Sequence, residues 1–202
     1  MARAANPGAP FDAIFDDVTK TTVAAHLTDC DFLFLVADSM QARLLFNSVV
    51  HQYLIPGAQV GAKVVTSLGS GDILDVFAVY RPVTPDAGCL WCNGLINTAR
   101  LQEEALSSAE RAAQRYVQEA TVVAPSVITL NSVAAAHAAN DFLFSVTGLH
   151  TDELGHDYLR WLPRSADVRF DAPRRDGACP ECGADAHSRL ARGDARRLPT
   201  RT

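Results

Sequence analysis

The 202-residue sequence lacks any apolar run long enough to cross a membrane. Its longest clean apolar stretch, residues 32–37, has the length of a β-strand, whereas a membrane-spanning helix needs about 18 residues or more. Residues 1–10 also lack the basic and then apolar order of a secretory signal peptide. We therefore expect a cytoplasmic protein that has no membrane partner and whose cysteines stay reduced.

Basic residues are also few, with 18 Lys and Arg against 23 Asp and Glu, a net charge of −5 and an isoelectric point near 5.6. This balance argues against bulk binding of nucleic acid. Hydrophobic residues make up 48% of the chain, which suits a globular domain. We expect this domain at residues 11–183, between a disordered N-terminus at residues 1–10 and a disordered Arg-rich tail at residues 184–202.

Common motifs of nucleotide binding and hydrolysis are absent as well. No glycine-rich loop of the dinucleotide or P-loop type occurs, and neither does the serine-hydrolase pattern GxSxG or the zinc-protease pattern HExxH. The Gly-rich residues 69–71 are followed by a strand pattern, which makes them a turn. The six histidines show no ligand spacing, so we interpret each as a surface residue or a satisfied core residue.

The pattern of hydrophobic residues predicts an α/β fold. A strand buried on both faces at residues 31–37, a helix at 40–55 and a strand at 58–65 form a βαβ unit with parallel strands. A tight turn then leads into an antiparallel strand at residues 73–80. The other expected elements are a strand end at 11–18, helices at 21–27, 98–120 and 126–149, and short strands at 158–162 and 167–170. Alanines in the long helix would let it pack closely on the sheet.

Four of the five cysteines form two CxxC pairs, Cys89–Cys92 and Cys179–Cys182. Two-residue spacing lets both sulfurs of a pair face one ion, and four thiolates suit tetrahedral zinc in a closed structural site. Two redox disulfides or a chance arrangement are the alternatives. A redox CxxC is expected at the start of a helix, however, and both pairs lie in predicted loops. We interpret the fifth cysteine, Cys30, as an inert core thiol.

A pair of charged residues follows the first strand. Asp38 comes directly after it, and ligands of open parallel sheets bind beyond the carboxyl ends of the strands, where an Asp can hold magnesium beside a phosphate. From the local sequence alone, the N-cap of the following helix is the favoured role for Asp38. Arg43 lies one helical turn further on, and it either reaches the same site or is solvated.

These features together resemble one protein family. In the segment DFLFLVADSMQARLLFN, an apolar strand precedes the pattern D-[NS]-x-x-x-R-x-x-x-N, with Asp38, Arg43 and Asn47 at its marked positions. The next strand with Gly61, the first CxxC, an Ala-Pro pair before a long helix and the late CxxC complete the order. Over residues 11–183 the chain is similar to the C-terminal half of the ThiF/MoeB/HesA superfamily, the adenylyltransferase fold shared with ubiquitin-activating enzymes.

The resemblance implies a Rossmann-like fold and a function. Family members bind ATP and magnesium and adenylate the C-terminal glycine of a ubiquitin-like or sulfur-carrier protein. By this resemblance Asp38 helps to hold magnesium and Arg43 belongs to the same cofactor site. The four cysteines of the CxxC pairs would be structural zinc ligands.

The N-terminal half of the family, which carries the glycine-rich nucleotide loop, has no counterpart here. We therefore expect an incomplete fold that is inactive by itself and that binds ATP and magnesium only when the missing half is supplied. Either the sequence is a truncated gene product, or a separate polypeptide supplies that half. The expected partner is such a polypeptide or a second copy of the chain in a homodimer. Residues 93–123 contain no cysteine, so a thioester step from that loop is not expected. Two other interpretations stay open: a non-catalytic zinc-stabilised module that binds a ubiquitin-like partner or dimerises, and a zinc-stabilised redox protein.

Overall fold

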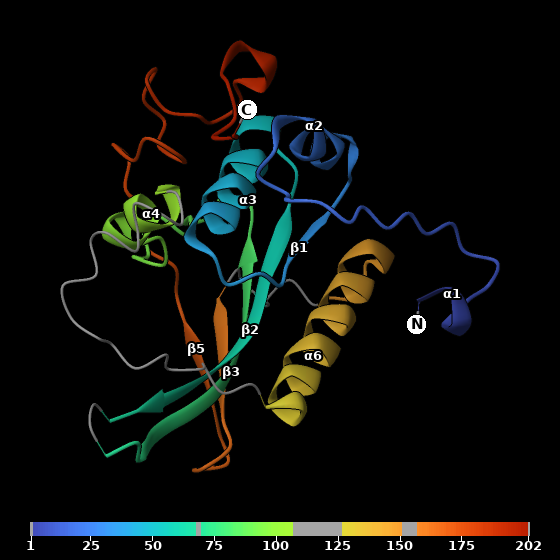
Figure 1. Ribbon diagram of the computed structural model, residues 1–202, viewed down its shortest axis with the longest axis vertical. Coiled ribbons are helices and arrows are strands. Elements are labelled where there is room, and N and C mark those ends of the chain that lie inside the picture. Colours follow the sequence, from blue (N-terminus) through green and yellow to red (C-terminus); the bar gives the residue numbers. More distant parts are fainter. Residues whose placement is uncertain (1, 68–69, 107–126, 151–156, 202) are drawn as a thin grey trace.

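The computed structural model describes residues 2–67, 70–106, 127–150 and 157–201, which form a mixed α/β fold around one five-stranded sheet (Figure 1). Its elements in chain order are α1 (Ala2–Ala5), α2 (Thr21–Ala24), the 3-10 helix η1 (Ala25–Asp29), β1 (Leu33–Leu35), α3 (Met40–Tyr53), β2 (Gly57–Thr66), β3 (Ile73–Val83), α4 (Thr98–Ala105), α6 (Ile128–Thr147), β4 (Tyr158–Leu162), β5 (Asp167–Asp171) and the 3-10 helix η2 (Gly193–Ala195).

The sheet has the strand order β1-β2-β3-β4-β5. β1 and β2 are parallel and are connected through α3, which confirms the predicted βαβ unit. β2 and β3 form a long antiparallel pair, and β4 and β5 confirm the two short strands predicted near the C-terminus. Residues 11–18 form no strand, and the part of the predicted helix beyond residue 106 lies outside the described residues.

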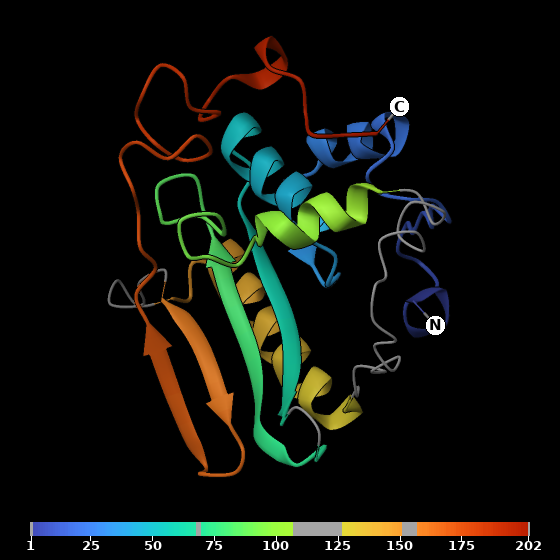
Figure 2. The same ribbon diagram turned by 60° about the vertical axis from the view of Figure 1, so that its left-hand side comes forward.

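The helices α3 and α6 cover opposite faces of the sheet. The strand register places Phe34 beside Ala58 on the face of α6, and Leu33 beside Gly57 on the face of α3. Figure 2 shows α6 behind the sheet and α4, which contacts α3, in front of it. A Cβ at residue 57 would lie 2.8 Å from the Phe46 ring, so glycine is required where α3 approaches the sheet.

Each face of the sheet has its own core. The core on the α3 face contains the largest fully buried apolar side chains, which are those of Leu45, Val49, Val50, Val83 and Leu90. On the other face, Ala134 and Ala138 lie four residues apart on α6 and are buried against β2 and β3. Their small side chains let α6 lie close to the sheet, as predicted.

β1 differs from the prediction of a strand buried on both faces. It lies at the edge of the sheet, and the side chains of Phe34 and Val36 are 45% and 77% exposed. Phe32 and Phe34 contact Phe142 of α6. The contacts of α6 with the sheet are concentrated on β2 and β3. An apolar run predicts burial only where helices cover both faces, and α6 is centred on β2 and β3.

The C-terminal segment also differs from the expected disordered tail. Residues 185–201, which we call the C-terminal strap, run over α3 and end beside α2 (Figure 2). Ser188 and Arg189 are buried, and the Arg201 amide donates to the Thr19 carbonyl oxygen at 2.7 Å. The strap has few apolar residues, so composition predicts disorder, but its contacts are polar and are made with distant parts of the chain.

At the other end of the chain, α1 is a single helical turn, and residues 3–10 are exposed. The expected disorder of residues 1–10 therefore stays a prediction. Within the part of the chain that the structure describes, no helix combines the length and the apolar character that crossing a membrane requires.

Candidate metal centre

The first CxxC pair follows β3 and forms a tight knuckle. The Cys92 amide donates to the Cys89 sulfur at 3.3 Å, and the Asn93 amide donates to the Cys89 carbonyl oxygen at 3.2 Å. Gly94 follows with a φ of +65°, a conformation that glycine adopts without strain. Cys89 is fully buried and Cys92 is half-buried. The knuckle therefore holds both sulfurs close together on one short turn.

The second CxxC pair forms an equivalent knuckle after β5. The Glu181 amide donates to the Cys179 sulfur at 3.4 Å, and the Gly183 amide donates to the Cys179 carbonyl oxygen at 3.0 Å. A Cβ at residue 183 would lie 2.5 Å from the Gly177 carbonyl oxygen and 2.6 Å from that of Cys179. Only glycine fits there, because neither backbone oxygen can move away without opening the turn.

The structure brings the four predicted ligands together. The Cys89 and Cys179 sulfurs are 3.7 Å apart, the Cys92 and Cys182 sulfurs are 3.5 Å apart, and all four lie within 4.8 Å of one another. Around a tetrahedral zinc ion with Zn–S bonds of about 2.3 Å, the sulfurs are about 3.8 Å apart. A disulfide needs about 2.0 Å, and all four cysteines are free thiols. The spacing therefore fits a shared metal ion.

The electrostatics of the cluster also favour a cation. Hydrogen bonding with the Cys89 thiol lowers the pKa of Cys182 to about 5, and the same contact raises the pKa of Cys89 far above its ordinary value. Thiols bind metal ions as thiolates, and Cys182 is fully buried. A metal ion bound to the four sulfurs would supply the positive charge that buried thiolates need.

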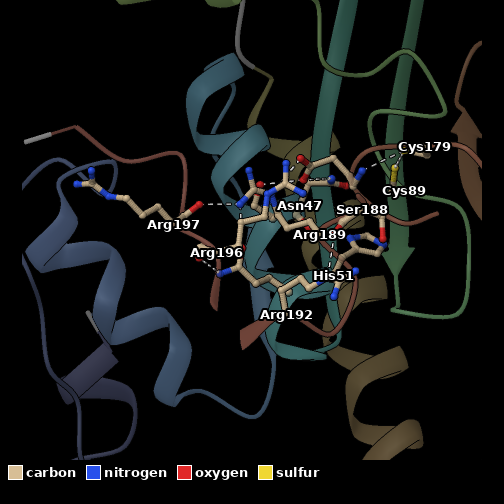
Figure 3. Close-up of polar contacts among 12 residues, drawn as sticks. Asn47, His51, Cys89, Cys179, Ser188, Arg189, Arg192, Arg196 and Arg197 are labelled. Atoms are coloured by element: carbon tan, nitrogen blue, oxygen red, sulfur yellow. Dashed lines mark hydrogen bonds and ion pairs between the residues drawn. The ribbon is translucent and has the colours of Figure 1, made fainter. Parts of the chain in front are cut away.

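Asn47 of α3 joins the two knuckles (Figure 3). Its side-chain oxygen accepts from the Leu90 amide in the first knuckle at 2.9 Å, and its Nδ2 donates to the Glu181 carboxylate in the second at 3.2 Å. Ser48 also donates to Glu181, at 2.8 Å. The family pattern marked Asn47 without a role, and sequence analysis missed Glu181, because nothing in the local sequence predicts that its carboxylate is buried.

Asp38 and Arg43 lie at the N-terminal end of α3. Asp38 is exposed, and the N-cap is Ser39, whose hydroxyl accepts from the Ala42 amide at 3.2 Å, so the capping role favoured for Asp38 is wrong. Arg43 donates through Nη1 to the Leu95 carbonyl oxygen at 3.1 Å, while its Nε has no partner among the described residues. Burial lowers the pKa of Arg43 and the Asp38 carboxylate opposes this, so the two groups interact electrostatically.

Glu104 of α4 is a further residue that sequence analysis missed. Its carboxylate accepts from the Met40 and Gln41 amides at 2.9 and 3.0 Å, and so it occupies the N-terminus of α3. The free amides at a helix N-terminus carry partial positive charge, which favours an anion at this place. The sequence of α4 indicated only a polar helix, because this contact joins residues that lie far apart in the chain.

Cys30 differs from the prediction of a core thiol. Its side chain is exposed, and its thiol donates to the His26 carbonyl oxygen at 3.4 Å. Cys30 follows η1 directly and precedes the edge strand β1, where no helix covers it. The prediction failed for the same reason as the predicted burial of β1.

Neither a protein-family model nor a curated protein matches this sequence. Solved structures do. In fold, this chain is similar to MccB of E. coli. The MccB structure with ATP gives a TM-score of 0.58 at 17% sequence identity, covering 90% of this chain and 48% of the MccB chain. The MccB structure with AMPCPP and MccA gives 0.54 at 16% identity, covering 84% and 44%.

A further structure, described as the microcin C7 biosynthetic enzyme MccB in complex with N-formylated MccA, gives a TM-score of 0.55 at 15% identity, covering 83% of this chain and 45% of that chain. The chain thus spans about half the length of the MccB chains that it matches. At this level of identity, the likeness to MccB concerns the fold.

Proposed function

We propose that this chain forms the metal-binding half of an ATP-dependent adenylyltransferase of the Rossmann-like ThiF type, which activates the C-terminal carboxylate of a peptide or protein. The observation that carries the proposal is the similarity in fold to MccB over 90% of the chain. MccB has been solved with ATP and with MccA, which supports a nucleotide and a peptide as the ligands of this fold. From the sequence resemblance, the proposed substrate is a ubiquitin-like or sulfur-carrier protein.

Asp38 is the residue to which we assign magnesium binding. It follows the parallel β1–β2 pair at its carboxyl end, where ligands of open α/β sheets bind, and its carboxylate is exposed. Arg43 interacts electrostatically with Asp38 and has an Nε that no described residue engages. Magnesium, when bound, neutralises phosphate oxygens and orients the triphosphate. Asp38 would supply an oxygen ligand, and Arg43 a positive charge beside the phosphates.

The four cysteines Cys89, Cys92, Cys179 and Cys182 would hold a structural zinc ion. Four thiolates fill a tetrahedral coordination sphere, so the ion has no open position for a substrate. Its role is mechanical, because it joins the segment after β3 to the segment after β5. Through the two hydrogen bonds of Asn47, it also fixes α3, the helix that begins beside Asp38.

The ATP site would be completed by elements that residues 1–202 do not hold. These residues contain no glycine-rich nucleotide loop, and they cover 48% of the MccB chain solved with ATP. Further sequence or a partner protein would supply the loop, whose backbone amides bind the phosphates. The isolated 202-residue chain is therefore expected to bind zinc without catalysing exchange between ATP and pyrophosphate.

The test uses the protein as its native cell makes it, after its intact mass and N-terminal sequence have been measured. Exchange between ATP and radioactive pyrophosphate is followed with a ubiquitin-like protein that ends in glycine. We expect carrier-dependent exchange that falls at least 100-fold in Asp38→Asn and stays at the wild-type rate in Asp29→Asn, a matched change at another exposed aspartate. Equal rates in the two variants would overturn the role of Asp38. Robust exchange by residues 1–202 alone would overturn the proposal that further sequence or a partner must complete the ATP site.

A second function is favoured by the exposed apolar residues of the β1 edge. Phe34 and Val36 are 45% and 77% exposed, and exposed apolar surface of this kind commonly binds another protein. Together with the missing nucleotide loop, they fit a non-catalytic, zinc-stabilised module that binds a ubiquitin-like protein or dimerises. Capture of a ubiquitin-like protein to the same extent with and without ATP, and without exchange, would support this module. A clean monomer in sedimentation would count against dimerisation.

A further inference from the structure

Backbone groups of the C-terminal strap form hydrogen bonds with α3 and, at its far end, with residues beside α2. The Ala191 amide donates to the His51 carbonyl oxygen at 2.9 Å, and Gln52 donates through Nε2 to the Gly193 carbonyl oxygen at 2.7 Å. At the far end, the Arg201 amide donates to a carbonyl oxygen beside α2. Because few apolar side chains of the strap are buried, these polar contacts account for most of its attachment.

Arg189 adds a set of contacts that joins several parts of the chain (Figure 3). Its side chain is 10% exposed, and its Nε donates to the Glu181 carboxylate at 3.1 Å. Its Nη1 donates to Gln52 of α3 and to the Arg197 carbonyl oxygen, both at 2.8 Å. The Arg189 amide donates to the Pro180 carbonyl oxygen at 2.8 Å. Arg189 thus joins the start of the strap, its later part, α3 and the second knuckle.

Glu181, the partner of Arg189, lies inside the second knuckle between two of the cysteines. Its own amide donates to the Cys179 sulfur, so the position of its backbone is part of the knuckle turn. Its carboxylate is 7% exposed and accepts from Asn47, Ser48 and Arg189. A change in the knuckle turn would therefore move the carboxylate away from three donors at once.

We propose that a metal ion bound by the four cysteines locks the C-terminal strap onto α3 through the Glu181–Arg189 ion pair, and that loss of the ion releases the strap. The inference rests on the metal site of the proposed function. A buried ion pair is stable only while its geometry is accurate, and four thiols that no ion holds together lose the geometry of the knuckle. Without the ion pair, only a little buried apolar surface holds the strap, so the strap opens before the core does.

Trypsin tests the release, because it cuts after arginine only where the backbone is locally unfolded, and Arg192 and Arg197 lie in the strap. The zinc content of the full chain is measured, and digestion is then compared by mass spectrometry with zinc bound, after chelation, and after zinc is restored. We expect chelation to speed cleavage after these two arginines at least tenfold and reversibly. Cleavage after Arg160, which lies in β4 between β3 and β5, should change less than twofold.

Two variants separate the ion pair from the metal itself. With zinc still bound, Glu181→Gln and Arg189→Gln should each speed cleavage of the strap at least fivefold, because each removes one charge of the ion pair. Glu103→Gln, at an exposed position of α4, should cleave at the wild-type rate. If Glu181→Gln also loses zinc, Arg189→Gln decides whether the ion pair holds the strap, since Arg189 lies outside the knuckle.

Absence of zinc from the purified chain would overturn both the metal site and this inference. Zinc that chelation removes without changing cleavage of the strap more than twofold would overturn the inference alone. Cleavage after Arg160 that rises in parallel with cleavage of the strap would also overturn it, because the whole fold would then be opening. An Arg189→Gln variant that keeps both zinc and the wild-type cleavage rate would do the same.

Discussion

Replacing Asn47 by alanine is expected to loosen both cysteine knuckles at once. Asn47 is fully buried, and its side chain makes one hydrogen bond to each knuckle, from the Leu90 amide at 2.9 Å and to Glu181 at 3.2 Å. Leu90 is also fully buried, so water cannot replace the missing oxygen beside its amide. The variant would therefore leave a buried donor without a partner and separate α3 from both turns.

The size of the effect follows from the two lost bonds. A buried amide left without a partner costs about 1–3 kcal/mol, and a hydrogen bond to a charged carboxylate contributes about 1.5–3 kcal/mol. Glu181 keeps its bonds from Ser48 and Arg189, which reduces the second loss. We expect the free energy of unfolding to fall by about 3–4 kcal/mol. Zinc affinity should fall by about 10–100-fold, as is usual for residues that orient metal ligands.

Urea denaturation of the zinc-loaded protein measures the first quantity, and competition with a chromophoric chelator measures the second. Asn140→Ala, at an exposed position of α6, is the control and should change the free energy of unfolding by less than about 0.5 kcal/mol. Asn47→Asp keeps an oxygen for the Leu90 amide but places a second carboxylate against Glu181, so it should destabilise at least as much as alanine. Wild-type stability and zinc affinity in Asn47→Ala would refute the reasoning.

Three further predictions concern other contacts. Gly183→Ala would place a Cβ 2.6 Å from the Cys179 carbonyl oxygen, and chelator competition should show zinc affinity reduced at least tenfold. Glu104→Gln should lower the free energy of unfolding in urea by about 0.5–1 kcal/mol, less at high salt, because the N-terminus of α3 loses its anion. Burial lowers the pKa of His137, with Asp141 opposing, so below about pH 6.5 the unfolded state binds a proton that the folded state does not. Stability should therefore fall as the pH falls below that value, and His137→Gln should flatten the decline.

Each of these predictions has a matched control. Gly177→Ala should keep wild-type zinc affinity, because no atom lies within 4 Å of the added Cβ. Glu103→Gln and His26→Gln alter exposed side chains and should leave stability and its pH dependence unchanged. Equal zinc affinity in the two glycine variants would contradict the close packing of the knuckle. A Glu104→Gln variant as stable as its control would refute the stabilising interaction at the N-terminus of α3. An unaltered pH profile in His137→Gln would exclude a role of that imidazole in the pH dependence of stability.

Much of the fold could be predicted because its signals are local. The apolar run of β1, the helical spacing of α3 and the turn residues before β3 lie within a few residues of the structure that they specify, so periodicity and turn chemistry predicted the βαβ unit and the strands after it. The same holds for the four cysteines that are proposed as metal ligands. Two-residue spacing is itself the condition for two sulfurs to face one ion, so the four cysteines could be named without knowledge of the fold.

The misses have one physical cause. Burial of β1 on both faces, disorder of the C-terminal strap and a core position for Cys30 were predicted from local composition, which does not record which distant element covers a residue. α6 is centred on β2 and β3, so it leaves the edge strand β1 partly uncovered. The strap is held by buried polar contacts of Arg189, and composition treats a polar segment as one that cannot pack.

The sequence by itself therefore determined the helices and strands, the parallel β1–β2 pair and the set of four cysteines. Only the tertiary structure decided that Asn47 joins both knuckles, that Glu104 occupies the N-terminus of α3, and that Glu181 and Arg189 form a buried pair between the second knuckle and the strap. The contacts of Asn47 and Glu104 join residues that are distant in the chain, whereas Glu181 and Arg189 are eight residues apart and meet because both pack beside α3. Whether such groups meet is set by the packing of α3 and α4 beside the sheet, and no local pattern of residues encodes it.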